Sequence, residues 1–310
     1  MRCLVLGGGG FIGSCITDRL LKLGHTVRVF ERPRVQTYRD FGKNEKIEWY
    51  QGDFQSETDI NESVKGCQIA FHLISTTLPK NSNDDPIFDI ESNVIGSLRL
   101  LSCCVREKIE KIIFISSGGT VYGIPNALPV GETHTTDPLV SYGIAKLTIE
   151  KYIHLYYQLH GLPYVILRLS NPFGERQAVN TAQGAVAVFL YKALKGEEIE
   201  VWGDGSVTRD YIYIQDVVDA FTLAMNHKEK SGLFNIGSGL GLSLNEVIAE
   251  IELLLGREVK KRFMPPRKFD VPITRLDINR AKNILGWHPQ VTFQEGLRRT
   301  LQWMHGHLKL

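Results

Sequence analysis

The sequence predicts an α/β fold, a doubly wound parallel β-sheet with helices on both of its faces. Over residues 1–170, short apolar runs alternate with longer segments of helical periodicity. The runs are apolar on both faces of a strand, as in parallel sheets that helices cover on each side. A glycine-rich turn directly follows the first run, which is typical of a phosphate-binding βαβ unit. These observations place the main sheet in the amino-terminal half of the chain.

The predicted elements of this half alternate regularly. Six strands are expected, at residues 2–6, 26–30, 47–50, 68–73, 111–116 and 164–169. The clearest helical patterns between them span residues 11–24, 87–107 and 141–160.

The pattern changes after about residue 170. Helical segments follow at 182–195, 215–227, 243–255, 277–285 and 293–305, with short β-rich runs between them, such as 258–263. This organisation predicts a Rossmann-type dinucleotide-binding domain over residues 1–172 and a smaller C-terminal α/β substrate-binding domain over residues 173–310. Residues 210–240 are expected to return to the first domain, so the boundary is interleaved.

The composition is that of an ordinary globular protein, with 43% apolar residues, 23% charged residues and a net charge of +2. So small a net charge gives no electrostatic reason to expect binding to nucleic acid or to an anionic membrane surface. No apolar run reaches the roughly 18 residues of a transmembrane helix. We therefore expect no nucleic-acid partner and no membrane span.

The five cysteines form no C-x-x-C pair and no Cys/His spacing typical of a metal site, so no metal is expected. Cys3 lies in an apolar strand pattern and Cys103 and Cys104 in a helical one, and buried or half-buried free thiols are typical of a reducing compartment. The first residues form a strand pattern that leads into the glycine turn, and they do not resemble a signal peptide. A cytoplasmic location is therefore expected.

The glycine turn places Gly7, Gly10 and Gly13 three residues apart, between the first strand and the first helix. A residue without Cβ lets the backbone fold back tightly and approach a pyrophosphate. The unpaired N–H groups of the helix then offer partial positive charge to the phosphates. Phe11 and Ile12 begin this helix and are expected to border the cofactor. The strand–turn–helix context predicts a site for a nicotinamide dinucleotide.

Glu31 ends the second predicted strand, where an acidic side chain can hold the hydroxyls of the adenosine ribose. A carboxylate there repels the 2′-phosphate of NADP, so NAD is the predicted cofactor. The neighbouring Arg32 is the argument for NADP, because arginine binds phosphate well. Asp53 and Phe54 follow the third strand and are expected to contact the adenine.

Tyr142 and Lys146 are the residues that best indicate chemistry. They are four positions apart in a predicted helix and therefore share one helical face. A phenol with its usual pKa of about 10 is a poor base at neutral pH, and a neighbouring ammonium group lowers that pKa. Tyr142 can then accept a hydroxyl proton while a hydride leaves for the cofactor. We predict Tyr142 as the catalytic base and Lys146 as the group that activates it and holds the nicotinamide ribose.

The glycine turn, the segment S-S-G-G-T-V-Y-G at 116–123 and the segment Y-G-I-A-K at 142–146 resemble the extended short-chain dehydrogenase/reductase family. The resemblance covers nearly the whole chain and is strongest to the NAD-dependent nucleotide-sugar epimerase/dehydratase branch, which includes UDP-glucose 4-epimerases. It implies NAD as the cofactor and a UDP-hexose as the substrate. It also implies that further residues line the cofactor site, namely Leu73, Ile74, Ser75, Asn93 and Ser116. Ile74 is bulkier than the residue that relatives often have at this position.

The resemblance also implies residues for the nucleotide sugar. The segment L-R-L-S-N-P-F-G matches a strand and loop with a substrate-binding asparagine, here Asn171. Arg209 and Arg267 match two arginines that pair with the nucleotide diphosphate, and Asp270 matches a position near the uridine ribose. The planar guanidinium of arginine suits bidentate binding to phosphate, which agrees with these roles.

The chain departs from the family pattern at Gly118. Relatives usually have serine or threonine there, and its hydroxyl hydrogen-bonds the reacting hydroxyl of the sugar. Ser117 and Thr120 are the nearest hydroxyl groups in the sequence. We expect one of them, with a preference for Thr120, or a water molecule to take this role, and both residues are candidate catalytic groups.

Oxidation of a sugar hydroxyl at C4 is common to the reactions that the resemblance implies. A 4,6-dehydratase would carry an Asp-Glu pair at Gly119 and Thr120, which this chain lacks, and no added group for a decarboxylase is evident. The favoured reaction is 4-epimerisation, in which a transient 4-keto sugar takes the hydride back on its other face. The alternatives are a 4-keto-sugar reductase that uses NAD(P)H and, because of Gly118, a non-catalytic NAD-binding scaffold. A small residue near Thr274 suggests that N-acetyl sugars are also accepted.

The helical patterns at 87–107 and 141–160 carry apolar residues on more than one face, for example Ile149, Ile153 and Tyr157. Relatives pair such helices between subunits. A homodimer is therefore expected, although these side chains would also fit the core of a monomer.

Overall fold

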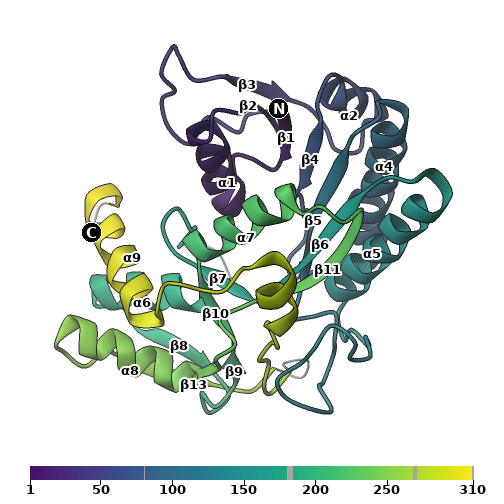
Figure 1. The fold of residues 1–310 in the computed structure, drawn as a ribbon. Helices are drawn as coiled ribbons and strands as arrows, with labels where there is room; N and C mark the ends of the chain where they lie inside the picture. Colours follow the sequence, from purple (N-terminus) through teal and green to yellow (C-terminus); the bar gives the residue numbers. More distant parts are fainter. Residues whose placement is uncertain (80, 180–183, 268–270, 309–310) are drawn as a thin grey trace.

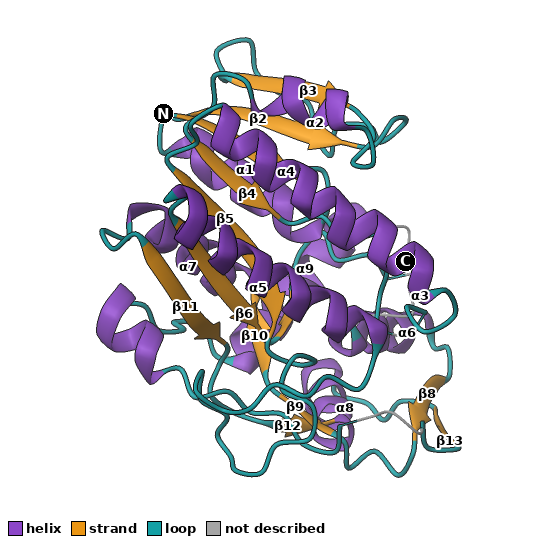
Figure 2. Cartoon of the chain, turned by 90° about the vertical axis from the view of Figure 1, so that its right-hand side faces the viewer, coloured by secondary structure: helices purple, strands orange, loops and turns teal. Residues whose placement is uncertain are grey.

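The computed structural model describes residues 1–79, 81–179, 184–267 and 271–308. A seven-stranded parallel sheet lies at its centre, in the order β11-β6-β5-β4-β1-β2-β3 (Figures 1 and 2). Its strands are β1 (Arg2–Leu6), β2 (Thr26–Glu31), β3 (Ile47–Gln51), β4 (Ile69–His72), β5 (Lys111–Ser117), β6 (Tyr164–Leu169) and β11 (Ser231–Ile236). The six strands predicted in the first half are confirmed, and β11 joins them from far along the chain.

The strand order reverses beside β1. The chain winds outward from β1 through β2 and β3, then crosses to the other side of β1 and forms β4, β5 and β6 in turn. The loops that leave the carboxyl ends of β1 and β4 therefore diverge, and a crevice forms between them. The glycine turn lies at this point of the sheet.

Helices cover both faces of the sheet (Figures 1 and 2). One face carries α1 (Phe11–Lys22) and α7 (Ile214–Asn226), and the other carries α2 (Glu57–Val64), α4 (Gly96–Arg106) and α5 (Ser141–His160). Each face has its own apolar core, with Ile16 and Val217 in the first and Leu100 and Ile149 in the second. The inner strands are buried on both sides and occur in the sequence as continuous apolar runs, whereas the edge strand β3 has no fully buried residue.

The helix predicted at 87–107 is interrupted by a π turn. It consists of α3 (Pro86–Asp89), the π-helix η1 (Ile90–Ile95) and α4. Gly96 lies where η1 passes into α4, and a Cβ there would come within 2.6 Å of the ring carbon Cε1 of Phe54. Turns of this kind are frequent at functional sites, and this one carries Asn93.

Helix α5 spans residues 141–160, as predicted, and ends at Gly161, which adopts the left-handed conformation that glycine tolerates. Ile149 and Ile153, two of the residues considered for a subunit contact, are buried in the core. The large apolar side chains that α5 exposes include Ile144, Leu155 and Leu159.

The smaller C-terminal part is built from short strand pairs and helices. Among the described residues the pairs are β7 (Asn171–Phe173) with β10 (Tyr211–Tyr213), β9 (Thr208–Arg209) with β12 (Leu242–Ser243), and β8 (Ile199–Trp202) with β13 (Lys261–Met264). The helices are α6 (Ala185–Lys195), α8 (Leu244–Leu255), α9 (Phe293–His307) and the π-helix η2 (Ala281–Leu285). The helix predicted at 277–285 is thus shorter than expected, and the strand predicted at 258–263 begins only at Lys261.

Three further observations concern the described part of the chain. It contains no helix whose length and apolar character together would let it cross a membrane. No group of three or more His, Cys, Asp or Glu side chains is placed there as metal ligands would be. The five cysteines are free thiols.

Candidate active site

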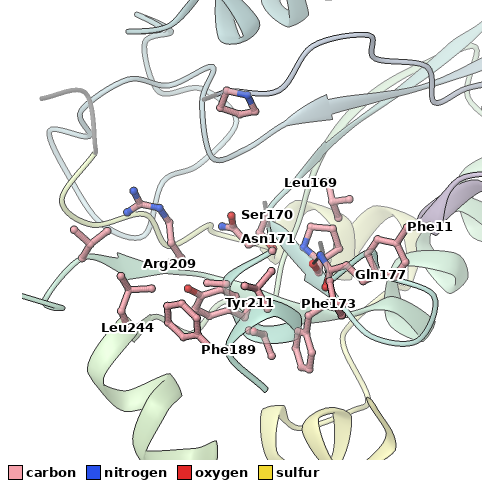
Figure 3. A pocket seen from close by; sticks show the side chains of 18 of the residues that line it. Phe11, Leu169, Ser170, Asn171, Phe173, Gln177, Phe189, Arg209, Tyr211 and Leu244 are labelled. Atoms are coloured by element: carbon pink, nitrogen blue, oxygen red, sulfur yellow. Dashed lines mark hydrogen bonds between the residues drawn. The ribbon is translucent and has the colours of Figure 1, made fainter. Parts of the chain in front are cut away.

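A cavity of about 820 Å³ lies beyond the carboxyl ends of the central strands and extends between the sheet and the C-terminal part. It brings together most of the residues that the sequence proposed for catalysis and substrate binding. These are Ser117, Thr120, Tyr142, Asn171, Arg209 and Arg267, together with Phe11, Ile12 and Ser116 from the proposed cofactor site. Figure 3 shows Phe11 at one end of this cavity and Arg209 with Leu244 at the other.

The glycine turn has the close packing that its sequence implies. Gly7 has a φ of +83°, and a Cβ at Gly13 would lie 2.1 Å from the carbonyl oxygen of Gly7. The N-cap residue of α1, Gly10, provides no side-chain cap, and the first turn of the helix has no acidic residue. The N–H groups at its start therefore keep their partial positive charge for an anion. These features fit the pyrophosphate of a dinucleotide.

The residues proposed for the adenosine end differ in their placement. A carboxylate oxygen of Glu31 accepts a hydrogen bond from the backbone N–H of Gly9 at 3.2 Å, so Glu31 lies beside the glycine turn. Arg32 and Asp53 are exposed. Phe54 is buried, and its ring packs against Phe30 and His72 in the core. Its side chain therefore serves packing, and its contact with adenine stays a prediction.

The loop after β4 crosses over the glycine turn. Leu73 and Ile74 lie beside Gly7: a Cβ built on Gly7 would have the Ile74 nitrogen at 3.5 Å and the Leu73 carbonyl carbon at 3.6 Å, which is ordinary van der Waals contact. Asn93 is buried, and its amide oxygen accepts a hydrogen bond from the Thr76 N–H at 2.9 Å. Ser75 hydrogen-bonds the Thr77 carbonyl oxygen at 3.1 Å. Asn93 thus holds this loop in place.

Tyr142 and Lys146 lie on the face of α5 that is turned toward the sheet. The Lys146 ammonium is buried, donates to the carbonyl oxygen of Ile115 at 3.0 Å, and lies 5.6 Å from the centre of the Tyr142 ring. Burial raises the pKa of Tyr142 to about 12, and the charge of Asp89 adds to this. Burial lowers the pKa of Lys146 to about 8, against the opposite effect of Asp89 and Glu150. A cationic group in the cavity would favour the phenolate.

The structure explains why glycine occupies position 118. A Cβ at Gly118 would lie 2.6 Å from a methyl carbon of Leu276 and 3.1 Å from the Arg168 carbonyl oxygen. A larger residue there would point into the core and away from the cavity. A Cβ at Gly119 would instead have Asn171 Nδ2 at 3.9 Å and Ser117 Oγ at 4.0 Å. The backbone here turns the hydroxyl of Ser117 toward the substrate side.

Thr120 is the second candidate hydroxyl and also lines the cavity. Its Oγ1 is buried, and it has no hydrogen-bond partner among the described residues. A buried polar group without a partner costs about 1–3 kcal/mol, a cost that a hydroxyl of a bound ligand would remove. Ser117 and Thr120 therefore both remain candidates.

A buried ion pair lies behind these residues. Glu150 on α5 and Arg168 on β6 approach to 2.6 Å, and both side chains are almost fully buried. Ser116 donates its hydroxyl hydrogen bond to the same Glu150 carboxylate. The side chain of Ser116 is thereby committed to the protein, and this pair ties α5 to β5 and β6.

The proposed diphosphate-binding residues come together from distant segments. Arg209 donates to the carbonyl oxygen of Val271 at 2.5 Å, and β9 runs beside residues 272–274. The guanidinium of exposed Arg267 stacks on the Trp202 ring at 4.4 Å. Asp270 lies outside the described residues. Thr274 is buried and is not among the residues that line the cavity, so the size of its side chain is no guide to the sugar.

The sequence reasoning missed several residues that hold this site together, among them Ser82, Asp89, Ser141, Glu150 and Arg168. One signal was present, because Glu150 follows Lys146 by four positions and so continues the same helical face. The others come from separate segments and had no such signal.

Fold and site together define a Rossmann-type α/β protein in which a dinucleotide-binding turn adjoins a tyrosine–lysine pair, with the tyrosine lining the cavity and the lysine buried behind it. The model of the NAD dependent epimerase/dehydratase family matches residues 3–237. The chain belongs to this family, and NAD is the cofactor, as the sequence predicted.

Individual relatives are consistent with this family membership. UDP-glucose 4-epimerase of Mycolicibacterium smegmatis is 36% identical over 307 residues, which cover 97% of this chain and 98% of the relative. The solved structure of UDP-glucose 4-epimerase of Thermotoga maritima with UDP-glucose is 35% identical, with a TM-score of 0.94 and full coverage of both chains. The complex of the Thermus thermophilus UDP-glucose 4-epimerase with NAD is 32% identical, with a TM-score of 0.91, over 99% of this chain and 100% of that chain.

Relatives with other activities also match at similar length. A dTDP-4-dehydro-6-deoxyglucose reductase of Escherichia coli is 31% identical over 306 residues, 96% of either chain. A UDP-N-acetyl-alpha-D-glucosaminuronate decarboxylase of Bacillus cytotoxicus is 32% identical over 321 aligned positions, 97% of either chain. The chain therefore resembles epimerases within a family whose members catalyse several nucleotide-sugar reactions.

Proposed function

We propose that this protein is an NAD-dependent UDP-hexose 4-epimerase that interconverts UDP-glucose and UDP-galactose through a transient 4-keto sugar. The N-acetyl forms of these sugars are a second proposed substrate pair, which is supported by similarity to a solved UDP-N-acetylglucosamine 4-epimerase and not by Thr274. The observation that carries the proposal is the single cavity that joins Tyr142 and two hydroxyl side chains to Arg209 and Arg267.

Tyr142 has the role of acid and base. In the oxidative half of the reaction its phenolate oxygen takes the proton of the C4 hydroxyl, and in the return half it gives the proton back. The buried Lys146, fixed by the Ile115 carbonyl oxygen, favours the phenolate because it places a positive charge near the ring. NAD, when bound, supplies the acceptor and later the donor of the hydride.

Ser117 or Thr120 holds the reacting hydroxyl in position. A hydroxyl at either place can accept or donate a hydrogen bond, and it can therefore serve both the alcohol and the ketone of the sugar. The unpartnered Thr120 oxygen favours Thr120, and the open position of Ser117 beside Gly119 favours Ser117. The proposal requires at least one of the two.

Arg209 and Arg267 hold the nucleotide end. Arg209 lies at the end of the cavity away from Phe11 (Figure 3), so a nucleotide sugar that binds both Arg209 and Tyr142 extends along the cavity. At the cofactor end, the glycine turn binds the pyrophosphate, and Glu31 binds the adenosine ribose. We further propose that residues 1–172 with 210–240 form the cofactor domain and that the remainder binds substrate.

The experiment is product analysis with purified protein and no added cofactor. UDP-, dTDP- and GDP-hexoses are each incubated with the protein, and the sugar products are separated by chromatography. The expected result is conversion of UDP-glucose and UDP-galactose into one equilibrium mixture from either side. Consumption of NADH or NADPH in a fixed ratio to product would refute the epimerase and identify a reductase, the activity of the E. coli relative. Failure to bind NAD would leave a protein without either activity.

We also propose a homodimer in the cytoplasm. Large apolar side chains stay exposed on α3, on η1 and along one face of α5, namely Ile87, Phe88, Ile90, Ile144, Leu155 and Leu159. Such a patch is typical of an interface. Sedimentation equilibrium is expected to give twice the mass of the chain, and a monomer for wild type would refute the dimer. The free thiols fit a reducing compartment.

A further inference from the structure

A buried carboxylate lies beneath the start of the helix that carries Tyr142 and Lys146. Asp89, the last residue of α3, has no exposed surface. One carboxylate oxygen accepts hydrogen bonds from the Thr77 hydroxyl and from Asn93 Nδ2, at 2.8 Å for the latter. The other accepts one from the Ser141 hydroxyl at 2.6 Å. Three donors from three segments therefore meet on one acid.

Helix α5 depends on this neighbourhood for its first turn. Its N-cap residue, Val140, provides no side-chain cap. The Ser141 N–H donates to Asn83 Oδ1 at 2.9 Å, and the Tyr142 N–H donates to Ser82 Oγ at 3.0 Å. The start of a helix carries unpaired N–H groups and partial positive charge. A buried anion at this point is therefore favourable, and the contacts fix the turn that presents Tyr142.

Asp89 also acts on the reacting groups through its charge. Its negative charge raises the pKa of Tyr142, in addition to the effect of burial, and it opposes the decrease that burial causes in the pKa of Lys146. The other ionisable groups around Lys146 are Glu150 on the same helix and His72 on β4. Burial lowers the pKa of His72 to about 3, so this residue is neutral, and Glu150 is paired with Arg168. Asp89 is thus the acidic group near Tyr142 that has no cationic side chain bonded to it among the described residues.

We propose that Asp89 is a positioning residue for the reaction proposed above. Its carboxylate anchors the first turn of α5 to the loop that follows β4, and it supplies the buried negative charge that balances the ammonium of Lys146. The proposal rests on the proposed function, because it assigns a role within that reaction. Asp89 does not itself line the cavity. Its effect on catalysis passes through Tyr142 and Lys146.

Asp89→Asn removes the charge and changes the side-chain volume little. The kcat profile is that of the enzyme with its cationic cofactor bound, which lowers the pKa of Tyr142 from its value in the empty cavity. The base Tyr142 works when deprotonated, and without the charge of Asp89 its pKa falls further, so the acid limb of the profile moves to lower pH. Lys146 works when protonated, and its pKa also falls, so the alkaline limb moves in the same direction. A shift of both limbs by roughly 0.5–1 pH unit is expected, at the low end of what one neighbouring charge causes. Asp84→Asn is the matched control, because Asp84 is exposed in the turn just before α3, and it should leave both limbs in place.

Ser141→Ala tests the anchoring separately. It removes one hydrogen bond to Asp89 and keeps the charge. We expect kcat to fall by roughly 10–150-fold, the factor that corresponds to one hydrogen bond to a charged group, with KM for the UDP-sugar and both pH limbs unchanged. An unchanged kcat would overturn the anchoring role. If Asp89→Asn lowers kcat but leaves both limbs of the pH profile in place, the electrostatic role is overturned and Asp89 is a purely structural residue.

A spectroscopic titration separates this proposal from the proposed function. In protein labelled with ¹³C-lysine, the Cε signal of Lys146 is assigned by its loss in Lys146→Arg. The midpoint of the pH titration of this signal is expected near pH 8 in wild type and at lower pH in Asp89→Asn, whatever reaction the enzyme catalyses. Equal midpoints would refute the role of Asp89 even in an active epimerase. A lower midpoint in a protein without epimerase activity would refute the proposed function alone. If Asp89→Asn does not fold, Thr77→Val and Ser141→Ala decide the anchoring, because each removes one bond to Asp89.

Discussion

The buried ion pair between Glu150 and Arg168 offers the sharpest test of how the site is held. In Glu150→Gln the guanidinium of Arg168 stays buried but loses the charge that it faces at 2.6 Å. Its Nη1 already has no hydrogen-bond partner among the described residues, and its other neighbour is the Tyr122 ring at 4.7 Å. Removing one partner of a buried pair costs about 3–5 kcal/mol, because an uncompensated charge remains in the interior. We expect the free energy of unfolding to fall by this amount.

The assay is urea denaturation followed by far-ultraviolet circular dichroism and by tryptophan fluorescence. The matched control is Glu198→Gln, whose pair with Arg262 at 3.1 Å is about half exposed on both sides. Such surface pairs contribute about 0–1 kcal/mol. If Glu150→Gln loses no more stability than the control, the reasoning from burial is refuted. Loss of NAD binding in a variant that is still folded would show in addition that the pair positions Lys146.

Three further predictions concern the cavity and the cofactor turn. Thr120→Val and Ser117→Ala are compared by steady-state kinetics, and at least one is expected to lower kcat by about 10–1,000-fold, as loss of a catalytic hydrogen bond does; unchanged turnover in both would leave the role to water. Gly118→Ser is expected to lower the free energy of unfolding by about 1–3 kcal/mol, because the added side chain overpacks against Leu276, and to leave kcat no higher. A higher kcat would show that the serine side chain reaches the cavity. Gly13→Ala is expected to abolish retention of NAD by the purified protein, because its Cβ would lie 2.1 Å from a carbonyl oxygen of the turn; normal retention would contradict the close packing.

The strands and most helices were predictable because their signals are local. Both faces of the inner sheet are covered, so its strands are short apolar runs. The extent of α5 follows from its periodicity and from Gly161 at its end. The π-helix η1 was not predicted, because the sequence shows one continuous helical pattern over residues 87–107.

The residues of the candidate site likewise fall into those that a local pattern predicts and those that depend on the tertiary structure. Tyr142 and Lys146 were found because four residues of helix bring two side chains to one face. The glycine turn was found because its strand–turn–helix context is contiguous. The choice between Ser117 and Thr120 could not be made from spacing, because it depends on where the backbone at Gly118 and Gly119 points each Cβ.

The sequence by itself determined the doubly wound fold, the dinucleotide turn and the tyrosine–lysine pair. The strands and helices, the turn and the pair each have a local pattern along the chain, so the sequence shows them without knowledge of tertiary contacts. Only the tertiary structure decided that Asp89 lies beneath Tyr142, that Glu150 faces Arg168, and that Leu276 fills the space beside Gly118. Those pairings form when separate segments pack, and their effects on charge and volume depend on burial, which sequence spacing does not encode.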